Sequence, residues 1–386
     1  MKKNTYILFF MLVLLILSCT KDDTILDNGP NPVNGSNDKE SGDEADNNTM
    51  STELNFTVVS KDTDLPPRMG QEMIAFKGEY WFMGGETPQA TPREGNTYFN
   101  DIWKSKDGLA WLKVTDNAPW PKRSNFNLFV FDGSLWIIGG KSKTVKSNDE
   151  WLNDVWKSAD GIKWTKVAQH GPWQTRLSPA VGVQGGKMYL IGGHSTTNWH
   201  LYQDVWESSN GTNWSKVASI SDELLGVEMT SQGIYEQSIL SLNNEYFMLG
   251  GSLASSFLGF TSVLKSTDLK KWELVIRDTP WKDTNYTSLI DIRPFVYKDN
   301  LMVIINNEVN GANKSVLYAS KDGRDWKLKN ELPSFIDGAV SKFGYLHIPR
   351  SLVVKDKILV YGSYKKTLAN PWLDDKTHII QLSAKK

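Results

Sequence analysis

Short hydrophobic segments alternate with polar turn residues, and the same order of segments returns along most of the chain. The stretch from Arg123 to Val167 contains four such apolar segments, the second of which ends on Gly139-Gly140. Asp132-Gly133 separates the first two segments, and Ala159-Asp160-Gly161 separates the last two. Short segments rich in β-branched and aromatic residues, bounded by Asp and Gly, are typical of antiparallel strands joined by tight turns. The pattern therefore predicts a unit of four antiparallel strands.

The unit repeats with a period of about 55 residues, which is typical of propellers and other repeat architectures. The strand that ends in Gly-Gly occurs four times, at Gly84-Gly85, Gly139-Gly140, Gly192-Gly193 and Gly250-Gly251. Two degenerate copies follow, ending on Asn306-Asn307 and on Gly362-Ser363. A Trp opens the fourth strand of five copies: Trp111, Trp164, Trp214, Trp272 and Trp326. Six copies predict six blades.

Gly-Gly after an apolar strand, an aromatic residue in the third strand and Trp in the fourth resemble kelch-type β-propellers, such as the central domain of galactose oxidase. The resemblance covers nearly all of residues 54–386. The segment Ser-x-Asp-Gly-x-x-Trp from Ser105 to Trp111 is also similar to the Asp-box of sialidase-like propellers. Both resemblances imply an all-β chain that forms a six-bladed β-propeller of four-stranded antiparallel blades.

The last blade lacks a fourth strand at the C-terminal end of the chain. The segment Phe56-Thr57-Val58-Val59, which precedes the first blade, matches the fourth-strand pattern, with Phe56 at the Trp position. An open ring would leave an unpaired hydrophobic edge, which proteins avoid. We therefore expect the N-terminal strand to complete the last blade and close the ring.

The N-terminus has the features of a targeting segment. Lys2-Lys3 precede the apolar stretch Tyr6–Leu17. At about 12 residues this stretch is too short to span a bilayer core of roughly 30 Å. Ile16-Leu17-Ser18-Cys19 resembles the bacterial lipobox, which implies cleavage before Cys19 and lipidation of its thiol. The alternative is an ordinary secretory signal with a chance cysteine. Lys21-Asp22-Asp23 resembles the surface-export signal of Bacteroidota lipoproteins.

The stretch that follows is rich in Asp, Asn, Gly, Ser and Pro and contains few apolar residues. Such a segment buries too little surface to offset its ordering entropy, so we expect a flexible tether. The predicted organisation is a signal peptide over residues 1–18, the lipidated cysteine and tether over 19–53, and the propeller over 54–386. The expected location is the outer membrane, with the propeller exposed at the cell surface and held to the membrane through the lipid alone.

Composition excludes several classes of function. The formal net charge is −1, so the sequence offers no electrostatic case for nucleic-acid binding. Cys19 is the only cysteine, which excludes an intramolecular disulfide and the Tyr–Cys cofactor of galactose oxidase. The five histidines lack metal-ligand spacing, and no phosphate-binding glycine loop occurs. We expect neither a metal nor a cofactor.

Loop length indicates which face of the propeller carries function. First-to-second connections such as Asp132-Gly133-Ser134 are very short, as are the third-to-fourth turns. The remaining connections are long and lie on the opposite face, where binding residues are commonly found. We therefore place the site on the long-loop face, at the mouth of the central channel.

Aromatic residues on that face would suit sugar rings, which offer C–H faces and hydroxyl edges. Pro-Trp pairs at Trp120, Trp173 and Trp281 occupy one place in three blades, so we expect them to pack between blades. The Arg residues 16 positions before Gly-Gly, which are Arg68, Arg123 and Arg176, are expected to be structural, as an Arg there is a common kelch feature. The candidate ligand-binding aromatics are those that do not follow the repeat: Trp151, Trp199, Tyr202 and Trp372.

Two positions on each innermost strand are expected to face the channel. They are Gly70 and Glu72, Asn125 and Asn127, Ser178 and Ala180, Glu236 and Ser238, Asp291 and Arg293, and Ile348 and Arg350. Charged residues gather at this ring: Glu72, Glu236, Asp291, Arg293 and Arg350, with Tyr235 beside Glu236. The alternative is a hydrated channel whose charges simply pair with one another.

Three functions remain open. The first is a propeller that binds a glycan or a partner protein, with Arg293, Arg350 and Glu72 among its ligand-binding residues. The second is a carbohydrate-active enzyme, because kelch-type sialic acid epimerases are also six-bladed and sialidase-like hydrolases use a Tyr–Glu pair. In that case Glu236, Asp291 and Tyr235 would be catalytic. The third is a protein-interaction scaffold without a small ligand.

Overall fold

The computed structural model divides the chain into the units Met1–Met50 and Ser51–Lys386, and the described residues all belong to the second. They are residues 54–60, 63–66, 68–87, 97–143, 149–195, 202–225, 234–235, 237–253, 258–259, 262–281, 294–309, 312–332, 350–363 and 377–384. The domain boundaries expected from the sequence at residues 18, 19 and 53 stay predictions.

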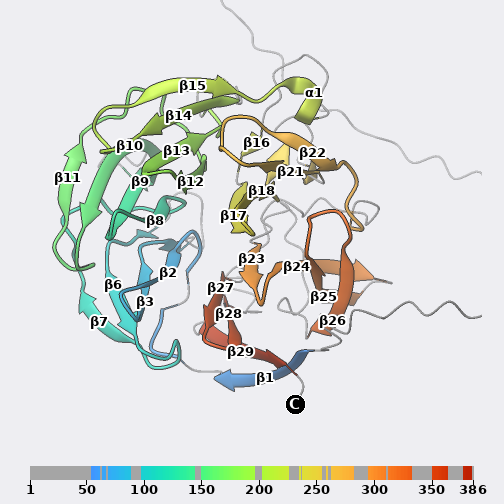
Figure 1. Ribbon diagram of the computed structural model, residues 1–386. Helices are drawn as coiled ribbons and strands as arrows, with labels where there is room; N and C mark the ends of the chain where they lie inside the picture. The colour runs from blue at the N-terminus through green and yellow to red at the C-terminus, as the bar shows by residue number, and fades with distance from the viewer. Residues whose placement is uncertain are drawn as a thin grey trace, which may run out of the picture. The chain divides into compact units, whose positions relative to one another are not determined.

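Six four-stranded antiparallel sheets form the blades of a propeller, as the repeats predict (Figure 1). Blade 1 consists of β2 (Glu72–Phe76), β3 (Glu79–Met83), β6 (Ile102–Ser105) and β7 (Leu112–Thr115). Blade 2 consists of β8 (Asn127–Phe131), β9 (Ser134–Lys143), β10 (Asp149–Ser158) and β11 (Thr165–Ala168). Blade 3 consists of β12 (Ala180–Gln184), β13 (Lys187–Ile191), β14 (Asp204–Ser208) and β15 (Ser215–Ser219). Blade 4 consists of β17 (Ser238–Leu242), β18 (Glu245–Leu249), β21 (Val263–Ser266) and β22 (Glu273–Ile276). Blade 5 consists of β23 (Phe295–Tyr297), β24 (Asn300–Val309), β25 (Ala312–Ser320) and β26 (Lys327–Leu332). Blade 6 consists of β27 (Arg350–Val354), β28 (Lys357–Ser363), β29 (Thr377–Ala384) and β1 (Leu54–Ser60).

A few short elements lie outside the blades. They are β4 (Glu86–Thr87), β5 (Thr97–Tyr98), β16 (Ile234–Tyr235), β19 (Ser252–Leu253), β20 (Leu258–Gly259) and the helix α1 (Asp222–Leu225). Among the described residues no helix is long and apolar enough to cross a membrane.

The N-terminal strand closes the ring, as expected. β1 pairs antiparallel with β29, with Leu54 opposite Ala384 and Phe56 opposite Leu382. In Figure 1 the blue β1 therefore lies beside the red β29, as the outermost strand of blade 6. The last blade thus combines both ends of the folded unit, and no blade of the described propeller lacks its fourth strand.

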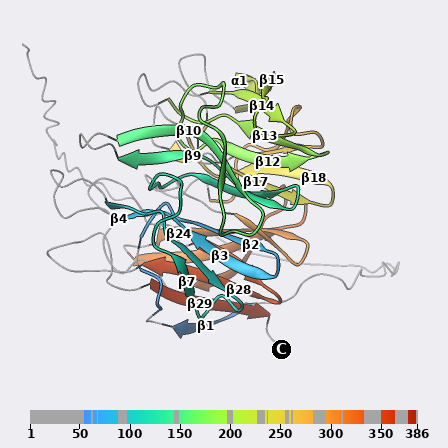
Figure 2. The same ribbon diagram turned by 90° about the vertical axis from the view of Figure 1, so that its left-hand side faces the viewer.

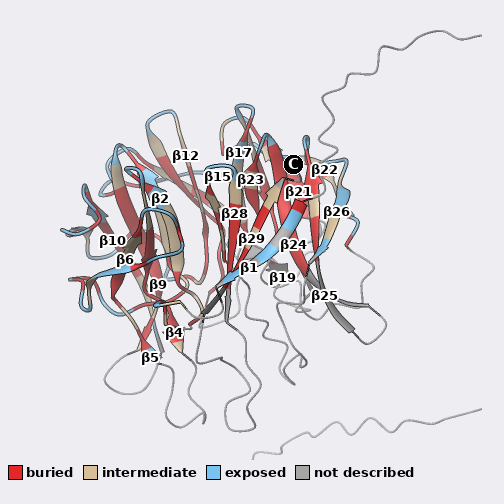
Figure 3. Cartoon of the chain, turned by 90° about the horizontal axis from the view of Figure 1, so that it is seen from below, coloured by how far each residue is buried: buried red, intermediate tan, exposed pale blue. Residues whose placement is uncertain are grey.

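Two-residue turns connect the first and second strands of each blade. Asp132 and Gly133 have φ values of 46° and 65°, and the equivalent residues of the other blades also have positive φ, with the exception of Asp356 in blade 6. Positive φ at the turn positions matches the mirror-image turns that suit the right-handed twist of paired strands. In Figure 3 these turns lie along one side of the propeller, with β4 and β5 on the other. The predicted short-turn face is therefore correct, and we call the opposite face, where β4 directly follows Gly84-Gly85, the Gly-Gly face.

The third-to-fourth turns share one hydrogen-bonding pattern. Ser105 Oγ accepts a hydrogen bond from the N–H of Gly108 at 2.8 Å. The Asp107 carboxylate accepts from Leu109 and Ala110. These backbone hydrogen bonds, foremost that from Leu109, lower the pKa of Asp107. Trp111 Nε1 donates back to the Gly108 carbonyl at 3.1 Å. Three further turns repeat the whole pattern, with Asn210 in place of Asp in the second: Ser158–Trp164, Ser208–Trp214 and Ser320–Trp326. The turn Ser266–Trp272 repeats the Ser and Asp contacts, but Trp272 Nε1 has no hydrogen-bond partner among the described residues.

The Arg residues before Gly-Gly tie each of their blades together, which confirms the structural interpretation. Arg123 Nη1 donates to the Gly139 carbonyl at 2.7 Å, and its guanidinium holds the Asp154 carboxylate through two contacts of 2.8 Å. Trp156 Nε1 donates to the same carboxylate at 2.7 Å. The pairs Arg68–Asp101 and Arg176–Asp204 repeat this arrangement.

The Pro-Trp residues pack between blades, also as expected. Trp120, Trp173 and Trp281 are buried and lie edge-on against the fourth-strand Trp of the following blade. The ring centroids of Trp173 and Trp214 are 4.8 Å apart, and those of Trp281 and Trp326 are 5.0 Å apart. Aromatic residues thus fill the seams between blades and hold the innermost strands around one centre.

Candidate functional site

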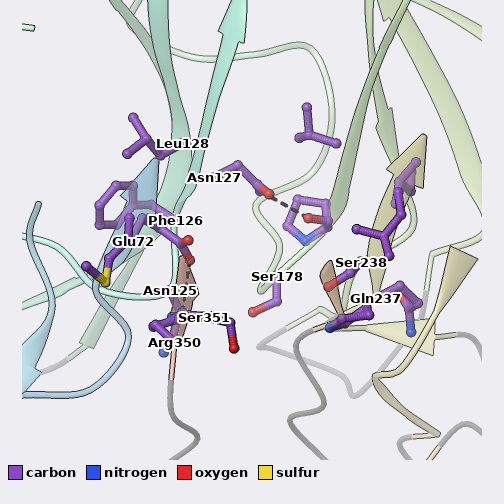
Figure 4. Close-up of a pocket in the computed structure, with 16 residues that line it drawn as sticks. Glu72, Asn125, Phe126, Asn127, Leu128, Ser178, Gln237, Ser238, Arg350 and Ser351 are labelled. Atoms are coloured by element: carbon purple, nitrogen blue, oxygen red, sulfur yellow. Dashed lines mark hydrogen bonds and ion pairs between the residues drawn. The ribbon is translucent and has the colours of Figure 1, made fainter. Parts of the chain in front are cut away.

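A cavity of about 330 Å³ occupies the centre of the propeller, where the innermost strands of the six blades converge. Each blade contributes at least one residue to its lining, because the first strand of every blade is the one nearest the axis. The polar residues that line it are Glu72, Asn125, Asn127, Ser178, Gln237, Ser238, Arg350 and Ser351. In Figure 4, Asn125, Ser351 and Arg350 lie on one wall and Gln237 and Ser238 on the other, with Ser178 between them.

The count of inward positions along the innermost strands is largely correct. Glu72, Asn125, Asn127, Ser178, Ser238 and Arg350 line the cavity as predicted. Gly70 and Ala180 are errors, since neither lines the cavity, and Ala180 is buried in the core beside Tyr189 and Ile191. The neighbouring Pro179 and Val181 form that part of the wall.

Arg350 and Glu72 form an ion pair across the closing seam. Arg350 begins β27 in blade 6, and Glu72 begins β2 in blade 1. Arg350 Nη2 lies 3.0 Å from Glu72 Oε1. Arg350 Nε donates to the Gln71 carbonyl at 2.9 Å. These two predicted ligand-binding residues therefore contact each other. For this pair, the structure agrees with the alternative hypothesis of a hydrated channel whose charges pair with one another.

The other described residues of the cavity lining are uncharged, with amide, hydroxyl and apolar side chains. Asn127 Nδ2 donates to the Pro179 carbonyl at 3.0 Å, which fixes the amide of Asn127 (Figure 4). Ser178 is more than nine-tenths buried, and its Oγ has no hydrogen-bond partner among the described residues. Ser178 and Asn125 also have φ values of 43° and 50°, in the left-handed region that non-glycine residues seldom adopt. Such backbone strain is commonly found at binding sites.

Several predicted site residues lie outside the described residues. They are Cys19, Glu236, Asp291, Arg293, Trp199 and Trp372. Tyr235 is described through its backbone only, which pairs with Ser252 in the small sheet of β16 and β19. Of the predicted charged ring, the structure thus describes Glu72 and Arg350.

Tyr202 follows the repeat, so the prediction that it stands outside the repeat is wrong. Its ring stacks on Arg176 at 4.0 Å, as Phe99 stacks on Arg68 at 3.9 Å in blade 1. The N–H of Tyr202 donates to the Gly193 carbonyl, as that of Phe99 donates to Gly85. The repeat was hidden because the loops before the two aromatics differ in length. A ligand-binding role for Tyr202 stays a prediction.

Trp151 belongs to a cluster at the Gly-Gly face between blades 1 and 2. It lies opposite Lys141 on the β9–β10 hairpin, which projects on the same side as β4 (Figure 2). Lys141 Nζ is 5.9 Å from the Trp151 ring and 5.8 Å from the Tyr98 ring. The same ammonium is 4.0 Å from Glu86 Oε2. Lys141 thus joins the two blades, and Trp151 forms part of that contact.

The polar residues that directly follow Gly-Gly are not among the site residues predicted from the sequence. Glu86 is buried and accepts a hydrogen bond from Ser124 Oγ at 2.9 Å. His194 occupies the equivalent place in blade 3 and is also buried, which lowers its pKa. Each of these residues forms an isolated bridge to the segment that enters the innermost strand. In the sequence, a polar residue follows each Gly-Gly pair, and this regularity could have identified these residues. Among the described residues, no group of three or more His, Cys, Asp or Glu side chains is arranged to hold a metal ion.

Comparison with known proteins gives partial matches. The chain matches no protein-family profile. It is 31% identical over 108 residues to N-acetylneuraminate epimerase of Pasteurella multocida (strain Pm70), a match that covers 28% of each protein. It is 24% identical over 168 residues to Tip elongation aberrant protein 3 of Schizosaccharomyces pombe, covering 36% of this chain and 15% of that protein. A solved structure of YjhT aligns with a TM-score of 0.49 and 17% identity, over 68% of this chain and 84% of that one.

The matches to the two curated relatives span about a quarter and about a seventh of those proteins' own lengths. Their activities are therefore a source of hypotheses for this chain. The fold itself rests on the blades and their register, which the structure shows directly.

Proposed function

We propose that this propeller binds a glycan in its central cavity, entered from the Gly-Gly face. The observation that carries the proposal is the cavity lining, in which amide and hydroxyl side chains from different blades converge on one space of about 330 Å³. That volume falls within the range of about 300–1,000 Å³ typical of small-molecule sites. Sugars offer many hydroxyl groups, which amides and serines can bind in both directions.

The match to N-acetylneuraminate epimerase supports a sugar as the ligand. That name refers to an amino-sugar acid, which carries hydroxyl, acetamido and carboxylate groups. The cavity holds partners for the hydroxyl and acetamido groups, with Asn127 and Ser238 as examples, whereas the guanidinium of Arg350 is paired with Glu72.

The experiment that tests the proposal is a glycan-array screen of the purified full chain. Ser238→Trp places a large ring in the cavity and should abolish glycan binding. Ser241→Trp is the matched control, because Ser241 lies on the same strand, is exposed and is absent from the cavity lining. Glycan binding that survives Ser238→Trp at full strength would exclude the cavity as the site.

An enzyme is the second candidate, favoured by the name of the same relative. Under this hypothesis Glu236 and Asp291 would transfer protons and Tyr235 would assist. Glu236→Gln should then reduce turnover by roughly 100-fold while sparing binding. If the protein is a binder, the same change should leave glycan affinity within about twofold, and no turnover should be measurable in the parent.

We further propose that the chain is a lipoprotein exposed at the cell surface. The proposal rests on the only cysteine, Cys19, standing at the end of a lipobox-like segment, followed by Lys21-Asp22-Asp23. A flexible tether over residues 20–53 would hold the propeller away from the membrane, where a glycan or a partner protein can reach it.

A further inference from the structure

The guanidinium of Arg350 is held along one edge by two consecutive residues of blade 1. Nε donates to the backbone carbonyl of Gln71 at 2.9 Å, and Nη2 contacts the carboxylate of Glu72 at 3.0 Å. The side chains of Arg350 and Glu72 retain 10% and 19% of their exposure. The pair is therefore largely withdrawn from water, where opposite charges attract each other more strongly than at the surface.

Arg350 and Glu72 are also the only charged residues among the described residues that line the cavity. Their opposite charges lie in contact, so the described part of the lining carries no net formal charge. The remaining polar lining consists of amides and hydroxyls, among them Asn125, Asn127 and Ser238. A wall of this composition matches a ligand that is polar and uncharged.

Ser178 adds an independent sign of a ligand. Its hydroxyl lies between the two walls in Figure 4 and has no hydrogen-bond partner among the described residues. A buried polar group left unpaired costs free energy, so proteins rarely keep one without a use. A hydroxyl or acetamido group of a sugar would supply the missing hydrogen bond.

We propose that Glu72 is a specificity-determining residue that makes the channel favour uncharged sugar units over sugar acids. The proposal rests on the proposed glycan-binding function and names the ligand class. Glu72 acts as a built-in counter-ion: its carboxylate occupies the position on Arg350 that the carboxylate of a sugar acid would otherwise take. A sugar acid must therefore displace Glu72 and leave two carboxylates close together in a confined space.

Removal of the Glu72 charge should reverse this preference. Glu72→Gln retains the length and a hydrogen-bonding oxygen but removes the carboxylate charge that an acidic ligand must compete with at Arg350. We expect the ratio of the Kd for N-acetylneuraminate to the Kd for N-acetylglucosamine to fall by about tenfold or more relative to the parent. Glu79→Gln is the matched control, since Glu79 pairs with Lys104 on the neighbouring strand and does not line the cavity.

The test is titration calorimetry of the full chain with both sugars, on the parent and the two variants. A parent that prefers N-acetylglucosamine, with the ratio shifted by Glu72→Gln and unchanged by Glu79→Gln, would support the proposal. A parent that binds N-acetylneuraminate at least as tightly, with no shift in the ratio, would overturn it while leaving glycan binding intact. Failure of the parent to bind any glycan on the array would refute the proposed function, and this proposal with it.

Because Glu72 spans the closing seam, a second variant guards against loss of folding. Glu72→Asp keeps the negative charge in the channel but withdraws it from Arg350 by one methylene group. We expect the same direction of change in the ratio, of smaller size. An unchanged ratio in a folded Glu72→Asp variant counts against the counter-ion role.

Discussion

The side-chain amide of Asn330 holds Leu54 by both of its backbone groups. Asn330 Oδ1 accepts from the N–H of Leu54 at 2.9 Å, and Nδ2 donates to the Leu54 carbonyl at 2.7 Å. Asn330 belongs to the outer strand of blade 5, while Leu54 begins the strand that completes blade 6. This contact therefore fixes the closing strand at its first residue, from the neighbouring blade.

Asn330→Ala should weaken the closure. Loss of two largely sheltered hydrogen bonds is expected to lower the free energy of unfolding by about 1–3 kcal/mol. The measurement is urea unfolding followed by tryptophan fluorescence. Asn213→Ala is a suitable control, because Asn213 is an exposed residue in a turn of blade 3. Equal stabilities of the two variants would show that Asn330 contributes nothing to closure.

Deletion of residues 54–60 is the stronger form of the same test. It removes β1 and exposes the edge of β29. We expect cooperative unfolding to be lost. A deletion variant that melts like the parent would mean that the closing strand is dispensable.

A second prediction concerns Leu269 and Gly182. Four third-to-fourth turns carry a Gly of positive φ that packs against the preceding blade, but blade 4 carries Leu269 there, with φ of 58°. The Leu269 side chain is fully buried and lies 2.8 Å from the position that a Cβ on Gly182 would occupy. Gly182→Val alone should lower the free energy of unfolding by about 1–3 kcal/mol, because the added side chain overpacks the space that Leu269 fills.

The partner change should compensate. Leu269→Gly alone removes a buried side chain and should lower the free energy of unfolding by about 2–5 kcal/mol. Relief of the strain of a positive φ at a non-glycine residue should offset part of this loss. The double variant should be more stable than the sum of the single effects predicts by at least about 1 kcal/mol, as a double-mutant cycle would measure. Simple additivity would show that the two residues do not share one space.

Acidification should destabilise the propeller through His194. Burial lowers the pKa of His194 below its ordinary value of 6.5, so the folded state binds its proton less readily than the unfolded state. The free energy of unfolding therefore does not depend on His194 above pH 6.5, where the side chain is neutral in both states, and it decreases as the pH drops from 6.5 toward the lowered pKa. His194→Gln should flatten the pH dependence of Tm below pH 6.5, whereas His170→Gln, at an exposed position, should retain the parental slope. Parallel slopes in the parent and His194→Gln would contradict this account.

The lipoprotein proposal is tested by Cys19→Ala. The variant should incorporate no lipid label and should leave the membrane fraction. Replacement of Lys21-Asp22-Asp23 by Ala should keep the lipid but protect the protein from protease added to intact cells. Cys19→Ala that stays membrane-bound and lipid-labelled would refute the anchor, and unchanged protease sensitivity of the second variant would refute the export signal.

The features that the sequence predicts well are local. Two-residue turns such as Asp132-Gly133, the Asp-box-like turns and the Trp that follows them are each specified by neighbours in the chain. They recur with a fixed period, so their number gives the number of blades. The fourth-strand pattern of the segment at Phe56 was specific enough to predict closure of the ring.

Contacts between blades are the part that periodicity could not supply. Arg350 and Glu72 are 278 positions apart, and only the closed ring brings them together. Gly182 and Leu269 depart from the repeat as a pair, and neither departure is explained without the other. Tyr202 was misjudged for a related reason, because loop length rather than position made it appear unique.

The most direct test of the central claim is the structure of the full chain bound to the glycan that it prefers on the array. We predict that the sugar lies in the central cavity, within hydrogen-bonding distance of Ser178 Oγ and of an amide such as Asn127. An uncharged part of the sugar should face the Arg350–Glu72 pair, with that ion pair intact. A glycan located on the short-turn face or on the outer strands, with the cavity unchanged, would contradict the account.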